Sequence, residues 1–141
     1  MSLKLDTVNG AIYTLLSTDA TLVSMGVTPC VNYAPEDGVS FPYIIWNEIS
    51  ITPDDTFTGR YWNILIQFDC YAQKKETSPT QSAQSVASDI AEALCSAMDG
   101  ASFTLTGLSH ICNRYEFQQS LWEDTVKAAR VIVEYKVIVG A

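Results

Sequence analysis

Two segments of the chain alternate apolar and polar side chains so regularly that a β-strand is the structure they favour. In the segment from Trp62 to Ala72 the even-numbered residues are apolar, and in the segment from Ala129 to Val139 the odd-numbered ones carry most of the apolar side chains. Because successive side chains of a strand point to opposite faces of a sheet, each segment has one buried, apolar face and one solvent-exposed, polar face, called here the wet face. Ile132 and Ile138 lie on the wet face of the second strand, which makes them candidates for a contact with another subunit.

The first strand also sets a carboxylate beside a thiol, at Asp69 and Cys70. The alternation places the Cys70 side chain in the buried row and directs Asp69 to the opposite face, so the two side chains cannot act as a catalytic pair. A reactive thiol needs an exposed and electropositive setting, whereas Cys70 lies between aromatic neighbours on an apolar row. We therefore interpret Cys70 as a small core side chain.

Helical patterns occur in two regions. Apolar residues at helical spacing predict an amphipathic helix over about residues 4–17, and Thr18 or Asp19 can cap a short continuation that stops near Gly26. The motif Ser78-Pro79-Thr80-Gln81 has the order of a cap, a first-turn proline and a capping box, which predicts the start of the main helix. An alanine-rich apolar stripe follows as far as Gly100, and its small side chains favour close packing on the sheet.

Further strands complete the predicted fold. The β-branched and aromatic stretch 43–51 predicts a strand with an apolar odd-numbered face, and residues 102–118 predict a hairpin that turns at Gly107. The proline-rich segment before residue 43 predicts a loop with at most one short strand around residues 30–33. This order indicates an α+β fold: a mostly antiparallel sheet with one long helix packed on one face and an N-terminal helix.

The bulk properties exclude several classes of function. The 141 residues suit a single domain spanning 1–141, and the net charge of −8 argues against tight capture of nucleic acid. The four cysteines are scattered singly and the chain has one histidine, so we expect no metal and no cofactor. The glycines are isolated, which argues against a phosphate-binding loop. No apolar run is long enough to span a membrane and the first residues lack the pattern of a signal peptide, so we expect a cytoplasmic product.

Two groups of residues have a possible chemical interpretation. Asp54 and Asp55 form a carboxylate pair, but they follow Pro53 in a turn, where aspartate is favoured by local hydrogen bonding. Cys70 or Cys112 with His110 is the combination that a small cysteine-dependent hydrolase would use. A ligand-binding α+β module is a further alternative, which requires a roomy apolar pocket.

Segments along nearly the whole chain together resemble the tail-completion family of long-tailed bacteriophages. In order, they read IYTLLSTDATL, FPYIIWNEIS, TPDDTFTGR, WNILIQFDCYA, SAQSVASDIAEAL and ARVIVEYKVIV. The segment VTPCVNYAPEDGVS departs from the family pattern.

The resemblance implies a non-enzymatic tail terminator: a homo-oligomeric, typically hexameric ring that caps the tail tube and joins it to the head. Its implied partners are the tail tube protein and a head connector or neck protein, with DNA passing through the lumen without specific binding. It also implies a place in the virion tail or neck after assembly in the host cytoplasm, with no catalytic residue to carry over. A different phage neck or connector protein is the alternative within this class.

A ring subunit needs segments that reach its neighbours, and the loop from Pro53 to Arg60 is the best candidate. We call this loop the arm; an unremarkable flexible hairpin connection is the alternative reading. Trp122 lies in the polar stretch SLWEDT, which predicts a connection that presents a contact residue. The residues predicted for an interface with another subunit or with the tube are therefore Asp54, Asp55, Thr56, Phe57, Thr58, Arg60, Trp122, Ile132 and Ile138.

Overall fold

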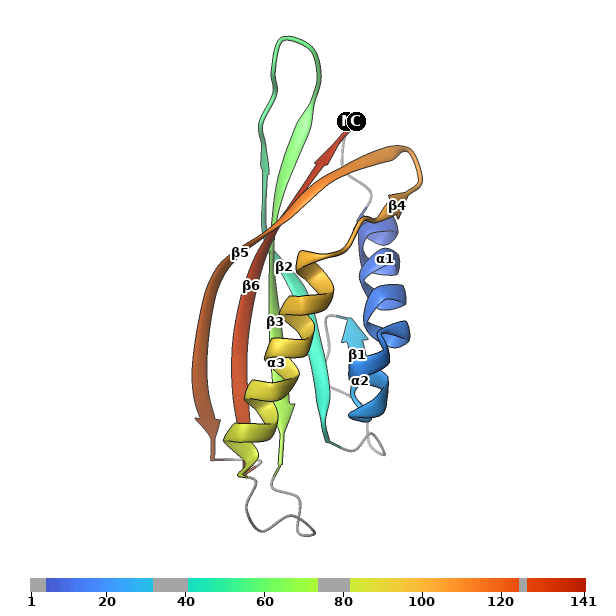
Figure 1. Ribbon diagram of the computed structural model, residues 1–141. Helices are drawn as coiled ribbons and strands as arrows, with labels where there is room; N and C mark the ends of the chain where they lie inside the picture. The colour runs from blue at the N-terminus through green and yellow to red at the C-terminus, as the bar shows by residue number, and fades with distance from the viewer. Residues whose placement is uncertain (1–4, 32–40, 74–81, 125–126) are drawn as a thin grey trace.

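The computed structural model describes residues 5–31, 41–73, 82–124 and 127–141 (Figure 1). In these ranges the helices are α1 (Leu5–Thr18), α2 (Ala20–Ser24) and α3 (Ala83–Asp99). The strands are β1 (Thr28–Val31), β2 (Tyr43–Pro53), β3 (Tyr61–Ala72), β4 (Thr104–Leu105), β5 (Leu108–Glu123) and β6 (Ala128–Gly140). The prediction of a mixed fold of helices and one sheet is confirmed.

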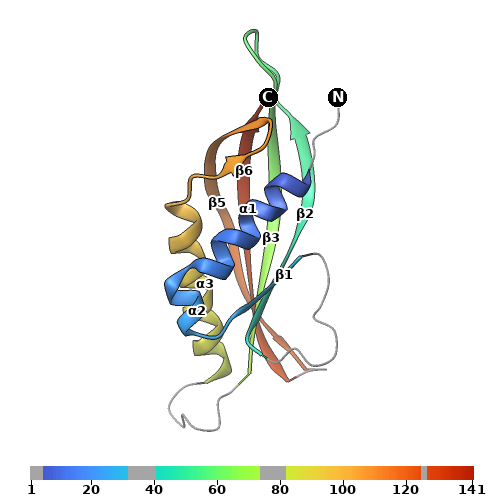
Figure 2. The same cartoon turned by 90° about the vertical axis from the view of Figure 1, so that its right-hand side faces the viewer.

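The strands form one sheet in the order β1-β2-β3-β6-β5-β4. Its centre is the long antiparallel pair of β3 and β6, in register from Tyr61 opposite Gly140 to Ala72 opposite Ala129. β1 runs parallel to β2, whereas the remaining neighbours are antiparallel. Figures 1 and 2 show the helices beside the sheet and the β2–β3 hairpin projecting beyond the other strands.

The alternation of β3 and β6 sorts side chains as the sequence predicts. The even-numbered residues of β3 and the odd-numbered residues of β6 are buried, and they join one hydrophobic cluster with residues of α1 and α3. Each such aliphatic or aromatic side chain contributes roughly 1.5–3 kcal/mol on burial, so these two rows carry much of the stability of the fold. Both helices therefore pack on the same face of the sheet. We call the opposite face, which carries the even-numbered side chains of β6, the open face.

The helical layer differs in detail from the prediction. α3 has 17 residues and α1 has 14, so the layer has two helices of similar length rather than one dominant helix. The side chain of Ser82 accepts a hydrogen bond from the backbone of Ser85, so Ser82 is the N-cap of α3. The motif from Ser78 to Gln81 itself lies outside the described residues. The predicted cap at Asp19 is confirmed, since its carboxylate accepts from the backbone N–H of Leu22.

The predicted apolar face of β2 is wrong. The core contains Ile44 and Trp46, while Ile49 and Ile51 are exposed. The cause is the pairing with β3, which sets Ile44 opposite Cys70 and Trp46 opposite Phe68 on the buried face. The register then shifts between Glu48 and Ser50, and this bulge exchanges the two faces for the rest of the strand.

β5 is longer than the sequence indicates. It continues beyond residue 118 to Glu123, and Trp122 lies within it, opposite Ala129 of β6. The predicted polar connection at Trp122 is therefore wrong, because pairing with β6 extends the strand through a stretch whose own composition favours a loop. None of the described helices is long and apolar enough to cross a membrane.

Candidate assembly interface

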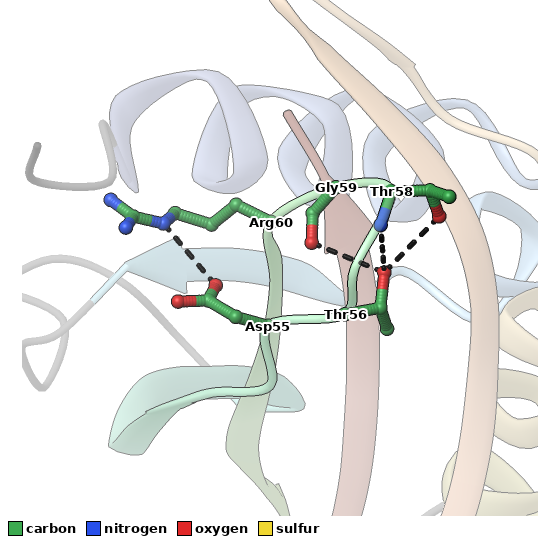
Figure 3. A network of polar contacts seen from close by, with 5 residues as sticks. All are labelled: Asp55, Thr56, Thr58, Gly59 and Arg60. Carbon is green, nitrogen blue, oxygen red and sulfur yellow. Dashed lines mark hydrogen bonds and ion pairs between the residues drawn. The ribbon is translucent and has the colours of Figure 1, made fainter.

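The arm closes the β2–β3 hairpin with an ordered polar network (Figure 3). The Thr56 backbone N–H donates to the Gly59 carbonyl at 2.8 Å, and the Thr56 hydroxyl lies 3.2 Å from the same oxygen and 3.3 Å from the Thr58 hydroxyl. The Arg60 Nε donates to the Asp55 carboxylate at 3.2 Å, which ties the two sides of the arm together. These contacts give the tip a defined conformation, as a recognition loop requires.

The network holds the Phe57 side chain in solvent. Phe57 has a relative exposure of 110%, so nothing in the described part of the chain shields its ring. The base of the arm is fixed by two backbone bonds: Asp54 N–H donates to Tyr61 O at 2.8 Å, and Ala141 N–H donates to Arg60 O at 2.9 Å. An exposed aromatic side chain on an anchored, internally bonded hairpin is the arrangement expected of a contact with another molecule.

Ile132 and Ile138 lie on the open face, half-buried among polar neighbours. Ile138 is opposite Asn63 and lies near the base of the arm, whereas Ile132 is opposite Asp69. At about 3.3 Å per residue, the six-residue separation puts the two isoleucines roughly 20 Å apart. They therefore lie at two separate points on one surface.

A charged cluster fills the open face beside Ile132. Arg130 places Nη2 3.2 Å from the Asp69 carboxylate and Nη1 2.9 Å from the Glu123 carboxylate. Gln67 donates to the other oxygen of Asp69 at 3.0 Å. Desolvation by itself lowers the pKa of Arg130, but the bond with Glu123 and the charge of Asp69 outweigh it and leave this pKa raised. Asp69 is thus a structural carboxylate that faces away from Cys70, as the alternation predicts.

Trp122 is half-exposed at 55% and lies across from a buried residue of β6, so it belongs to the helix-side face at the outer strand. It sits near the end of β5 that is remote from the arm (Figure 1). The predicted interface residues thus occupy three places: the arm tip, two points on the open face, and the far end of β5. The structure brings together only those of the arm.

Sequence reasoning missed three exposed apolar side chains on β5, which do not all lie on one face. Ile111, Tyr115 and Phe117 have relative exposures of 49%, 50% and 44%. The register of β5 on β6 shifts twice, between His110 and Cys112 and between Tyr115 and Phe117. Simple alternation cannot assign faces across these bulges, so the available signal was only the high content of large apolar residues in a strand.

The residues considered for thiol chemistry lie apart: Cys70 is opposite Val131 of β6 and His110 is opposite Val139, while Cys112 is opposite Ile138 on the other face of the sheet. Cys70 is fully buried, and its burial, with smaller contributions from Cys95 and Asp69, raises the pKa of its thiol strongly. His110 accepts from the backbone N–H of Phe103 at Nδ1, at 3.1 Å, and pairs through Nε2 with the Asn113 side-chain oxygen at 2.9 Å. Both ring nitrogens therefore serve the β4–β5 hairpin. In the described ranges, no group of three or more His, Cys, Asp or Glu side chains has the arrangement of a metal site.

Two grooves flank the helices, and neither is an enclosed apolar pocket. One, of about 430 Å³, lies between α2 and α3 and is lined by Asp19, Asp89 and Glu92 among others. The second, of about 610 Å³, lies between α1 and the segment that leads into β4, and threonine and serine hydroxyls contribute much of its wall. Both are open to solvent, unlike the mostly apolar clefts that bury small ligands.

The fold matches that of a chain in a solved structure. A solved structure described as "Virion of native gene transfer agent (GTA) particle" contains a chain that matches with a TM-score of 0.78 at 15% identity, covering 96% of each chain. At this identity the likeness concerns the fold. No curated protein matches the chain by sequence.

The family follows from the sequence itself. The family model described as "Tail completion protein gp17" matches residues 10–140, which is nearly the whole chain. The protein belongs to this tail completion family and is a structural tail protein. The expected resemblance to the tail-completion family is confirmed.

Proposed function

We propose that the whole chain acts as one non-enzymatic tail-terminator domain: its copies form a hexameric ring that caps the tail tube and joins the tail to the head. The partners are further copies of the chain, the tail tube protein and a head connector or neck protein. The protein is assembled in the host cytoplasm and resides in the tail or neck of the virion. The family match over residues 10–140 is the observation that carries the proposal.

The arm supports the ring. A head-to-tail ring needs two different surfaces on each subunit, one that reaches out and one that receives. The arm projects beyond the sheet, holds an exposed aromatic side chain and is anchored at both ends (Figures 1 and 3). We assign it the reaching role and treat Ile132, Ile138 and Trp122 as contacts with the tube or with other subunits.

The acidic charge supports a lumen through which DNA passes without binding. The net charge of −8 repels a polyanion at short range. Asp54 and Asp55 are exposed on the arm, whereas Glu48 is half-buried and has an oxygen without a hydrogen-bond partner. Glu48 is therefore not assigned to the lumen surface.

A non-enzymatic role agrees with the side chains that a hydrolase would require. The Cys70 thiol is inaccessible and its pKa is raised, and the imidazole of His110 has both nitrogens engaged in the hairpin. A nucleophile and a base must lie within hydrogen-bonding reach of each other and of a substrate. Among the described residues, Cys70 forms no such pair of nucleophile and base.

The proposal is tested with the purified protein, alone and mixed with tail tubes, by native mass spectrometry and electron microscopy. We expect rings of uniform mass that sit at one end of the tube and halt its growth. Deletion of Asp54 to Thr58 should leave a folded monomer, with unchanged circular dichroism, that no longer forms rings. A variant in which Val23, a half-exposed residue of α2, is changed to serine serves as the control for loss of an exposed apolar side chain.

Each part of the proposal has its own contradicting result. Rings of unchanged mass from the deletion variant would remove the arm from the subunit contact. Rings that never sit on tube ends would contradict the capping role, and a particle in which tubes stop at the correct length without this protein would contradict the terminator role altogether.

A further inference from the structure

The arm offers an apolar group at its tip, Phe57, and a negative charge at its base, Asp54, and neither has a partner among the described residues of its own subunit. Phe57 is fully exposed, and the Asp54 carboxylate makes no ion pair within the described part of the chain, in contrast to Asp55, which holds Arg60. The arm therefore presents the aromatic side chain of Phe57 at its tip and the unpaired carboxylate of Asp54 at its base. A surface that receives it should be apolar and should carry an unpaired cation.

The open face carries such a cation at Arg114. Arg114 pairs across the strands with Lys136, so two positive side chains are direct neighbours on the same face, with Cβ atoms about 5 Å apart. Like charges in this arrangement destabilise a sheet. Glu116 lies 3.7 Å from Lys136 and offsets one of them, but no described carboxylate lies within 4.0 Å of the Arg114 guanidinium. Glu116 and Glu134 balance the two cations in number, so Arg114 is the cation left without a carboxylate partner among the described residues, and it is available to an anionic partner.

Apolar side chains adjoin this basic pair. Phe117 is opposite Glu134 in the pairing that follows Arg114 with Lys136 on the open face, and 44% of its surface is exposed. Ile132, two residues from Glu134 along β6, lies on the same face and is half-buried. Phe117, Ile132 and the basic pair thus form one surface, the receiving patch, which is the counterpart of the arm tip in both polarity and charge.

The tip cannot reach the receiving patch of its own chain. Lys136 lies opposite Leu65 of β3, which is four residues below Tyr61 at the base of the arm. This separation corresponds to about 13 Å of strand, and the arm extends from its base in the other direction (Figure 1). A contact between the two surfaces therefore joins different copies.

We propose that the arm tip of one copy docks on the receiving patch of the next, with Phe57 against Phe117 and Ile132 and with Asp54 beside Arg114 and Lys136. The contact uses two different surfaces, so it is head-to-tail, the type of contact that generates a ring when the rotation between copies closes. It rests on the proposed function only in requiring that copies of this chain associate, and it identifies the surface that receives the arm.

The first test is photo-crosslinking in the assembled particle and in the purified protein. p-Benzoylphenylalanine replaces Phe57, and the crosslinked peptides are identified by mass spectrometry. The expected product joins position 57 to residues 114–117 or 132–136 of a second copy. Crosslinks to another part of a second copy, crosslinks only to a different protein, or no crosslinks at all would each overturn the docking.

The second test is exchange of charge in the purified protein. Asp54→Lys and Arg114→Glu should each weaken self-association by about tenfold or more, and the double variant should recover much of the loss. Glu92→Lys, an exposed residue of α3, is the matched control and should leave association within about twofold. Single variants that associate as the wild type does, or a double variant as weak as the sum of the singles, would contradict the pairing.

These results are distinguishable from failure of the proposed function. Rings that show the predicted crosslink but do not cap tubes would refute the terminator role and leave the docking intact. Tubes that are capped by rings whose crosslinks lie elsewhere would refute the docking and leave the terminator role intact.

Discussion

Loss of the Asp69 charge should destabilise the fold through Arg130. Asp69 and Arg130 have side chains that are 12% and 23% exposed, and their charged atoms lie 3.2 Å apart. At an effective dielectric constant near 20, charges at that distance attract by roughly 5 kcal/mol. Desolvation of both groups cancels part of this attraction. Arg130 also keeps its bond to Glu123 after the change, so Asp69→Asn should lower the free energy of unfolding by about 2–3 kcal/mol.

The measurement is urea unfolding followed by tryptophan fluorescence and circular dichroism. For a chain of this length, the expected loss corresponds to a fall in Tm of roughly 10 °C. A double-mutant cycle with Arg130→Met isolates the interaction, and we expect a coupling energy of about 1–3 kcal/mol. Asp124→Asn is the control, because its ion pair with Lys127 is solvated, with 79% of the Asp124 side chain exposed, and the change should stay within about 0.5 kcal/mol.

The reasoning would be refuted by an Asp69→Asn variant as stable as the wild type, or by a coupling energy near zero. Either result would mean that water replaces the missing charge and that the open face at Ile132 is wetter than its burial indicates. A loss as large for Asp124→Asn would show that the effect is one of net charge rather than of the buried pair.

Three further predictions concern the core and the hairpin. Tyr135→Phe removes the hydroxyl that donates to Asp99 at 2.8 Å, and should cost about 1–2 kcal/mol in chemical unfolding; an unchanged midpoint would show that the bond contributes nothing. The raised pKa keeps the Cys70 thiol protonated as pH rises, so native-state alkylation at pH 8 should leave it unlabelled until denaturant is added; rapid labelling would revive the thiol-enzyme reading. His110→Ala leaves the Phe103 backbone N–H without its acceptor, and hydrogen exchange at that amide should accelerate by about tenfold, while an unaltered rate would contradict the role of the imidazole.

The sequence predicts faces correctly where one row is apolar and the other polar. β3 and β6 satisfy this condition, and their buried rows follow from alternation alone. β2 does not satisfy it, since large apolar side chains occur both at even-numbered positions, Ile44 and Trp46, and at odd-numbered positions, Ile49 and Ile51. Only the pairing with β3 and the bulge near Ile49 decide which row is buried, and neither is a property of the segment by itself.

The residues of the candidate site likewise divide into those that the local sequence predicts and those that depend on pairing between distant strands. The turn at Asp54 and Asp55 and the exposure of Phe57 follow from local chemistry, because proline and glycine bound a short polar stretch between two strands. The receiving patch does not follow from local chemistry, because Arg114 and Lys136 become neighbours only through the long-range pairing of β5 with β6, which contains two bulges in β5. The same dependence on distant partners explains why the parallel pairing of β1 and the true end of β5 at Glu123 were not foreseen.

The central position of β6 also governs when the protein can fold during its synthesis. β6 is the last strand of the sheet to leave the ribosome, yet it separates β3 from β5 and pairs with both along most of its length. Before β6 emerges, the nascent chain contains two separate fragments of the sheet whose apolar side chains are still exposed. Such a state favours binding by chaperones until synthesis is complete. A translation product that stops short of β6 lacks the strand that unites them, and so it never becomes a building block.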